Sequence, residues 1–238
     1  MMLYQFPVSH YCEKVRWALD YKGIPHKVKN LLPGIHVKTT KKIAPKSSVP
    51  VIQHNSQIIQ GSSNILDYLE QEFPQNSLRH DLTDQQIQDW EKEADESIGP
   101  EVRRLCYHHV LNDKEITVAA LASNGPWYGK MLLKKMYPQL QQRMRQLMKI
   151  NDETAQQALE TINVYLQKLS NHLADRQYIV GDQFSRVDLT VASLLGPLLR
   201  PMKFDQPQGV AYPSALQSIR EEMTNNFPWV SDIYNKYR

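Results

Sequence analysis

The chain has 238 residues, of which 41% are hydrophobic and 22% are charged. This composition is typical of a soluble globular protein, and the length suffices for one large or two modest domains. No run is apolar for long enough to span a bilayer, and the first residues lack the basic segment and apolar stretch of a signal peptide, so we expect a cytoplasmic protein. The two cysteines, Cys12 and Cys106, fit a reducing compartment, because they have neither metal-ligand spacing nor the number that a disulfide framework needs.

The net charge of +3 is distributed unevenly along the chain. Residues 1–80 hold ten Lys and Arg against five Asp and Glu, whereas residues 81–238 hold eighteen against twenty. A basic first third suits a small anionic ligand, although solvated surface lysines explain the same count equally well. Because aromatic residues are not interleaved with these charges, we expect no nucleic-acid partner.

Residues 1–75 alternate between strand-like and helical segments. The expected elements are a strand at 3–6, a helix at 13–21, a strand at 27–30, a weakly helical segment at 36–43, a hairpin of the runs 49–54 and 57–59, and a helix from about 62 to 73. Gly23-Ile24-Pro25 ends the first helix, the polar pair Asn55-Ser56 makes the hairpin turn, and Pro74 closes the last helix. This order of elements, βαβαββα, is that of an α/β thioredoxin-like domain.

Residues 76–83 are polar and aperiodic, so we expect them to form a linker. Strand signals disappear beyond it, and residues 84–238 are expected to form an all-α bundle. Its helix-forming stretches are 84–110, 114–149, 152–174, 186–199 and 214–237, with breaks expected at Gly125-Pro126, Gly181 and Pro197. The clearest amphipathic stripe consists of Leu159, Ile162, Leu166, Leu169 and Leu173.

One helix start in this second part is specified by its side chains. The Ser185 hydroxyl can accept from the backbone N–H of Asp188, whose carboxylate can accept from the N–H of Ser185 in return, which makes a capping box. Phe184 and Leu189 stand at the two positions of a hydrophobic staple around it. We therefore expect a well-defined helix beginning at this point.

Residues 9–16, Ser-His-Tyr-Cys-Glu-Lys-Val-Arg, follow the first expected strand and open the first helix. They place a hydroxyl and a thiol at a helix N-terminus, where free N–H groups and the macrodipole favour an anion such as a thiolate. The segment resembles the C-x-x-C-x-K-V-R opening of glutaredoxin-like folds, with Ser9 in place of the nucleophilic cysteine. With a helical second half, the whole chain resembles the serine-type cytosolic glutathione transferases. The run 178–182 followed by the capping box at Ser185 also resembles a pattern of this family.

The resemblance implies a glutathione site in the first domain. Val49 before a cis-Pro50 would pair through its backbone with the cysteinyl portion, and Ser62 at a helix start would hold the γ-glutamyl carboxylate. Gly61 stands where the family has an acidic residue or Gln, with Gln60 one step earlier, and this departure puts the mode of γ-glutamyl recognition in question. Lys46 could pair with the glycyl carboxylate, or it could be a solvated loop lysine.

Two residues compete for the chemistry. Ser9 would donate a hydrogen bond to the sulfur of glutathione and so stabilise its thiolate, which would attack a small apolar electrophile. Cys12 would instead make the protein a glutaredoxin-like thiol transferase, unless it is a small structural cysteine. A third alternative is a non-catalytic glutathione transferase-like binding or adaptor protein, which the glycine at 61 favours.

The resemblance also implies an electrophile pocket between the domains and a homodimer. We expect Tyr11, Tyr107 and His108 to line that pocket, and further aromatic candidates are Trp90, Trp127 and Tyr128, although aromatic residues at helical spacing are more often core. A metal on the pair His108-His109 is not expected, because adjacent helical residues point about 100° apart.

Overall fold

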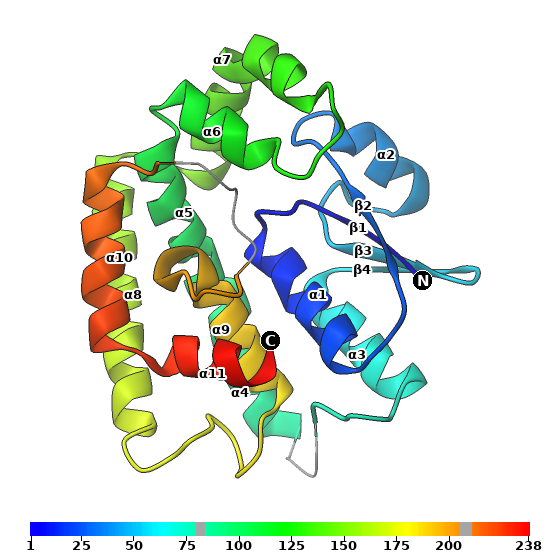
Figure 1. The fold of residues 1–238 in the computed structure, drawn as a ribbon, viewed down its shortest axis with the longest axis vertical. Coiled ribbons are helices and arrows are strands. Elements are labelled where there is room, and N and C mark those ends of the chain that lie inside the picture. The colour runs from blue at the N-terminus through cyan, green and yellow to red at the C-terminus, as the bar shows by residue number, and fades with distance from the viewer. Residues whose placement is uncertain (80–83, 205–210) are drawn as a thin grey trace.

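The structure is a computed structural model, and it describes residues 1–79, 84–204 and 211–238. Its first domain is built on a four-stranded sheet in the order β2-β1-β3-β4 (Figure 1). β1 (Met2–Gln5) pairs parallel with β2 (Lys27–Asn30) and antiparallel with β3 (Val51–His54), which forms a hairpin with β4 (Gln57–Gln60). The predicted α/β thioredoxin-like fold of this part is therefore confirmed.

Three helices accompany the sheet: α1 (His10–Tyr21), α2 (His36–Ile43) and α3 (Ser62–Glu72). α1 and α3 pack against each other, and α3 also contacts the hairpin strands. Leu3 and Ile52 of the sheet and Val15, Ile65 and Leu69 of these helices are fully buried in the main core.

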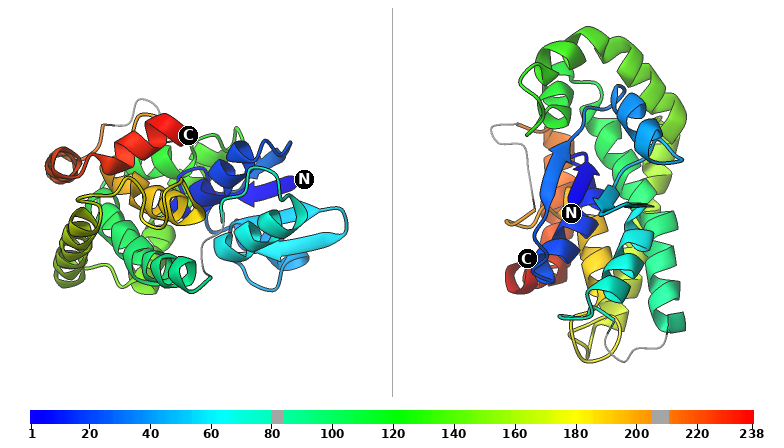
Figure 2. Two further views of the ribbon diagram at one scale, coloured as in Figure 1. Left: turned by 90° about the horizontal axis from the view of Figure 1, so that it is seen from below. Right: turned by 90° about the vertical axis from the view of Figure 1, so that its right-hand side faces the viewer.

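The second domain is helical throughout the residues that the structure describes. Its elements are α4 (Asp84–Glu93), a π-helix η1 (Ala94–Ile98), α5 (Gly99–Val110), α6 (Lys114–Leu121), α7 (Gly129–Met148), α8 (Asp152–His172), α9 (Arg186–Leu199), α10 (Ser214–Asn226) and α11 (Trp229–Tyr237). α9 is buried along almost its whole length, because it lies between α1 on one side and α4, α5 and α11 on the others (Figure 2).

Most of the expected elements agree with the structure to within a few residues. The first helix begins at His10, three residues before the expected position, because Ser9 caps it. The break expected at Pro197 is wrong, since α9 continues to Leu199; Pro197 lies in its last turn, where only two residues follow it. The linker expected at 76–83 lies partly outside the described residues, because the structure does not describe residues 80–83.

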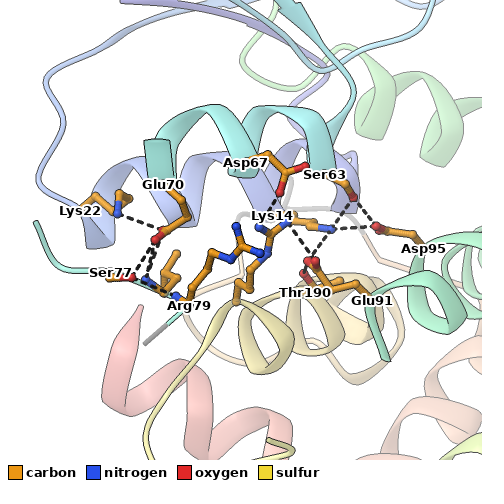
Figure 3. A network of polar contacts seen from close by, with 12 residues as sticks. Lys14, Lys22, Ser63, Asp67, Glu70, Ser77, Arg79, Glu91, Asp95 and Thr190 are labelled. Carbon is orange, nitrogen blue, oxygen red and sulfur yellow. Dashed lines mark hydrogen bonds and ion pairs between the residues drawn. The ribbon is translucent and has the colours of Figure 1, made fainter. Parts of the chain in front are cut away.

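The two domains are joined by a buried ionic network as well as by apolar contacts (Figure 3). Lys14 Nζ of α1 lies 2.8 Å from a carboxylate oxygen of Asp95 and 3.3 Å from one of Glu91. Arg186 of α9 pairs with Glu91 at 2.9 Å and with Asp67 of α3 at 2.6 Å. Lys14, Glu91 and Arg186 are all nearly inaccessible to solvent, so each buried charge is compensated by a partner from another element.

The C-terminal helix fastens the domains at a second place. The indole N–H of Trp17 donates to the carbonyl of Tyr237 at 2.9 Å, and Arg238 pairs with Glu13 at 2.8 Å. In the described part of the chain, no helix is both long and apolar enough to cross a membrane.

Candidate functional site

Ser9 lies between β1 and α1 and lines a cavity whose other lining residues come from both domains. It is the N-cap of α1, and its Oγ accepts a hydrogen bond from the Cys12 N–H at 3.4 Å. Ser9 is partly exposed and lines the cavity. A hydroxyl can accept one hydrogen bond and still donate another, so Ser9 can act on an atom in the cavity.

Cys12 lies one turn further along α1 and has a different environment. Its side chain is 0% exposed, and it does not line the cavity. Burial raises the pKa of the Cys12 thiol above its ordinary value, against the opposing hydrogen bond from Ser9. A buried thiol of raised pKa makes little thiolate at neutral pH and is a poor nucleophile.

The Val49-Pro50 peptide bond is cis, as the sequence predicts. Val49 lines the cavity together with Ser9, and no hydrogen bond of its backbone N–H or C=O is found among the described residues. An extended backbone with both groups available can pair with a bound peptide in the manner of an added strand.

The Gln60 side chain is used within the protein. Its amide nitrogen donates to the carbonyls of Lys46 and Ser48 at 2.9 and 2.7 Å, and its amide oxygen accepts from the Lys46 N–H at 3.0 Å. Gln60 thus fixes the loop that precedes the cis-proline. The exposed Lys46 side chain is left on the solvent side of that loop.

Gly61 and Ser62 begin α3, and their backbone explains the glycine. Gly61 has a φ of 95° and a ψ of 139°, a conformation that glycine adopts without the steric cost that a Cβ brings. Ser62 is buried to 7% exposure in the first turn of α3, where the helix leaves unpaired N–H groups. The glycine at 61 therefore has a conformational reason that is independent of ligand recognition.

The cavity has a volume of about 530 Å³ and takes its lining from both domains. Tyr11 and Tyr107, two of the residues proposed for an electrophile pocket, line it. The Tyr11 hydroxyl donates to the Asp95 carbonyl at 2.6 Å, and burial is the main cause that raises its pKa. Burial also raises the pKa of Tyr107 to about 12, so both phenols are neutral at physiological pH.

His108 does not line the cavity, contrary to expectation. It lies on the far side of α5, where its Nε2 is 3.7 Å from an Asp152 carboxylate oxygen. Arg103, Cys106, Tyr107 and Val110 form the face of α5 that lines the cavity, and the rotation of about 100° from Tyr107 to the next helical residue carries His108 off that face. The weaker aromatic candidates are also placed elsewhere: Trp90 packs against Tyr165 and His172, and Trp127 is 92% exposed. Tyr128, an exposed residue that stacks edge-on against Trp127, lies outside the lining as well.

The sequence reasoning missed the arginines of this cavity. Arg103, Arg143, Arg200 and Arg220 line it, from α5, α7, the end of α9 and α10. One local signal was available, since Arg103 stands four residues before Tyr107 and shares its helix face. The other three come from elements far apart in the chain, so no sequence spacing brings them together.

Both parts of the chain match sequence models of known protein domains. The sequence model of the glutathione S-transferase N-terminal domain matches residues 3–77, and that of the glutathione S-transferase C-terminal domain matches residues 131–215. The two matches together span more than half of the chain and both of its domains. The chain therefore belongs to the glutathione S-transferase family.

Three proteins that resemble this chain differ from it at most positions. Glutathione S-transferase 1 of Dianthus caryophyllus is 38% identical over 81 residues, which are 33% of this chain and 37% of that protein. The stringent starvation protein A homolog of Haemophilus ducreyi is 22% identical over 82% of this chain and 73% of its own length. The crystal structure of a glutathione S-transferase from Rhodospirillum rubrum F11 superposes with a TM-score of 0.65 at 18% identity, covering 98% of this chain and 85% of that one.

Proposed function

We propose that this protein is a glutathione transferase in which the Ser9 hydroxyl stabilises the thiolate of bound glutathione for attack on an electrophile in the cavity. The observation that carries the proposal is the position of Ser9: it caps α1, faces the cavity and lies there together with Val49 of the cis-proline segment. The family's name and the N-terminal domain match support glutathione as the substrate.

The peptide-binding elements fit glutathione. The free N–H and C=O of Val49 would hold the cysteinyl unit and place its sulfur near Ser9. The first turn of α3, with Ser62, would hold the γ-glutamyl carboxylate, because helix N-termini favour anions. Lys46 and Gln60 have lesser roles in this proposal: Gln60 shapes the loop, and the exposed Lys46 side chain would pair with the glycyl carboxylate.

The magnitude of the proposed effect is sufficient for catalysis. A hydrogen bond to a charged group contributes about 1.5–3 kcal/mol, which corresponds to roughly one to two pKa units of the bound thiol. A thiol whose pKa falls from about 8.5 to about 6.5 is mostly ionised at neutral pH. Ser9 does not act as a covalent nucleophile in this mechanism, because its role ends with the hydrogen bond to sulfur.

The test compares Ser9→Ala with Cys12→Ala in conjugation of glutathione to chlorodinitrobenzene. Loss of the Ser9 hydrogen bond is expected to lower kcat/KM by about ten- to a hundredfold, whereas Cys12→Ala leaves it nearly unchanged because that thiol is buried. The reverse pattern, with activity dependent on Cys12, would replace the proposal by a thiol transferase.

A non-catalytic role remains the second candidate, since one relative that spans most of the chain is not named as a transferase. Retention of the wild-type protein on immobilised glutathione separates the two. A protein that neither binds the resin nor conjugates any electrophile would be a binding or adaptor protein. The expected homodimer and cytoplasmic location stay predictions.

A further inference from the structure

The cavity beside Ser9 is strongly cationic. Its lining includes the four arginines Arg103, Arg143, Arg200 and Arg220, and among the described residues that line it there is no Asp or Glu. Apolar and aromatic side chains make up most of the remaining surface. A guanidinium that is partly removed from water costs solvation free energy, so a cavity built only for neutral ligands has no use for several of them in its wall.

Two of the arginines lie over one tyrosine ring, and a third acts electrostatically on a second tyrosine. The guanidinium carbons of Arg200 and Arg220 lie 4.3 and 4.6 Å from the ring centroid of the same residue, Tyr212. Arg103 shares a face of α5 with Tyr107, and it opposes the rise that burial causes in the pKa of Tyr107. Positive charge from α5, the end of α9 and α10 is thus concentrated at one part of the cavity wall.

Two of these side chains have unused hydrogen-bonding capacity. The Nε atoms of Arg103 and Arg220 are buried and have no hydrogen-bond partner. Arg220 donates to the Pro197 carbonyl at 3.0 Å and also interacts with the Cys106 thiol, and neither arginine forms an ion pair with any residue that the structure describes. An unpaired buried donor on a cation is the partner that a carboxylate or sulfonate oxygen satisfies best.

We propose that the second substrate of this protein is an amphiphilic organic anion, whose apolar body fills the cavity and whose carboxylate or sulfonate binds Arg103 and Arg220. The conjugation of this anion rests on the proposed transferase function, whereas its binding to the arginines does not. A volume of about 530 Å³ lies within the range of small-ligand pockets and accommodates a substituted aromatic ring. Arg143, exposed at the rim, would attract the anion during entry.

A matched pair of electrophiles tests the proposal: chlorodinitrobenzoate and its uncharged methyl ester. In both, the glutathione thiolate forms a C–S bond to the ring carbon that bears chlorine, and chloride leaves with the electrons of the broken C–Cl bond. The thiol proton has already passed to solvent, so the two reactions differ only in the remote carboxylate. We expect a lower KM for the benzoate than for the ester in the wild-type protein, and a difference that shrinks at high salt.

Substitutions then assign the effect to the arginines. Arg103→Gln and Arg220→Gln are each expected to raise KM for the benzoate about tenfold or more and to leave KM for the ester unchanged. Arg104→Gln is the control, because it removes the same charge from the neighbouring position of α5, where Arg104 pairs with Glu101 and does not line the cavity. Arg143→Gln provides a second variant at an exposed position that the fold tolerates.

Direct binding separates failure of this inference from failure of the transferase function. The fluorescent anion anilinonaphthalene sulfonate and the neutral phenylnaphthylamine report binding without any conjugation. One outcome is that the wild-type protein conjugates neither electrophile and still binds the anionic probe more tightly than the neutral one. If Arg103→Gln then loses this preference, the anion site is supported and the transferase function is not. Equal affinity for anionic and neutral probes in the wild type, or an unchanged preference in both arginine variants, overturns the proposal.

Discussion

At the scale of single residues, Tyr11 in the wall of the cavity is held by a hydrogen bond and by close packing against Gly99. Its hydroxyl donates to the Asp95 carbonyl, and the ring passes so close to Gly99 that a Cβ there would lie 2.4 Å from the phenol oxygen. A separation of that size is not possible between non-bonded carbon and oxygen atoms. The neighbouring Tyr11 side chain therefore explains why residue 99 is a glycine, and Tyr11 lines the cavity from this position.

We expect Gly99→Ala to destabilise the protein by about 1–3 kcal/mol, because either Tyr11 or the backbone of α5 must move. In a Tyr11→Phe background the clash with the hydroxyl disappears, so the same substitution should cost less. Urea unfolding of the four proteins of this double-mutant cycle measures the coupling. Additive effects of the two substitutions would show that the alanine is accommodated without displacing Tyr11.

At the scale of elements, local patterns predicted most of what the structure shows. Turn residues and apolar runs were sufficient to predict the four strands, because each strand is a short segment next to Pro, Gly or Asn. The capping box at Ser185 is confirmed: the Ser185 N–H donates to Asp188 at 2.9 Å, and the Ser185 hydroxyl caps α9 in return. Its hydrogen bonds join residues three apart, and such contacts are visible in a sequence.

Features that depend on tertiary contacts were not predictable in this way. The π-helix η1 has no local signature; its one extra residue per turn accompanies the positions of Asp95 and Gly99 beside Tyr11. The choice between Tyr107 and His108 at the cavity depended on the rotation of α5, which periodicity alone did not fix. Ser9, Val49 and Pro50 could be proposed as site residues from the sequence because they lie in short motifs.

The raised pKa of Asp188 predicts a pH dependence of the free energy of unfolding. Burial raises its pKa from 3.8 to about 6, although it accepts hydrogen bonds from the backbone of Ile179 and Ser185. Between these two pH values the folded protein binds more protons at this site than the unfolded chain, so the contribution of Asp188 to stability falls as pH rises through this interval and is constant above it.

The free energy of unfolding of the wild type relative to Asp188→Asn should therefore increase as pH is lowered from 7 to 4.5, since asparagine does not titrate. Urea melts of both proteins across this range supply the measurement. If this difference in the free energy of unfolding instead decreased toward low pH, the hydrogen bonds would outweigh burial and keep the carboxylate ionised.

At the scale of the whole molecule, the ionic network at the domain interface holds the two halves in register. It joins α1 and α3 of the first domain to α4, η1 and α9 of the second, and three of its charged residues, Lys14, Glu91 and Arg186, are buried (Figure 3). Burial alone would raise the pKa of Glu91, but the nearby cations Lys14 and Arg186 lower it below its ordinary value. The cavity between the domains thus depends on contacts remote from it.

Glu91→Gln is expected to destabilise the protein by about 3 kcal/mol or more, because it leaves two buried cations with fewer anions. Glu115→Gln is the matched control, since Glu115 pairs with Lys134 at 2.7 Å on the exposed surface and such pairs contribute about 0–1 kcal/mol. Denaturant unfolding measures both. Equal effects of the two substitutions would show that the network contributes no more than a surface ion pair.

The Ser9 mechanism is tested most directly by titrating the thiol of bound glutathione. The ultraviolet absorbance of the thiolate, followed against pH in the binary complex, gives its pKa without any second substrate. We predict a pKa about one to two units below that of the free thiol in the wild type and in Cys12→Ala, and a return toward the free value in Ser9→Ala. An unshifted pKa in the wild type, or a shift that survives Ser9→Ala and vanishes in Cys12→Ala, would contradict the account.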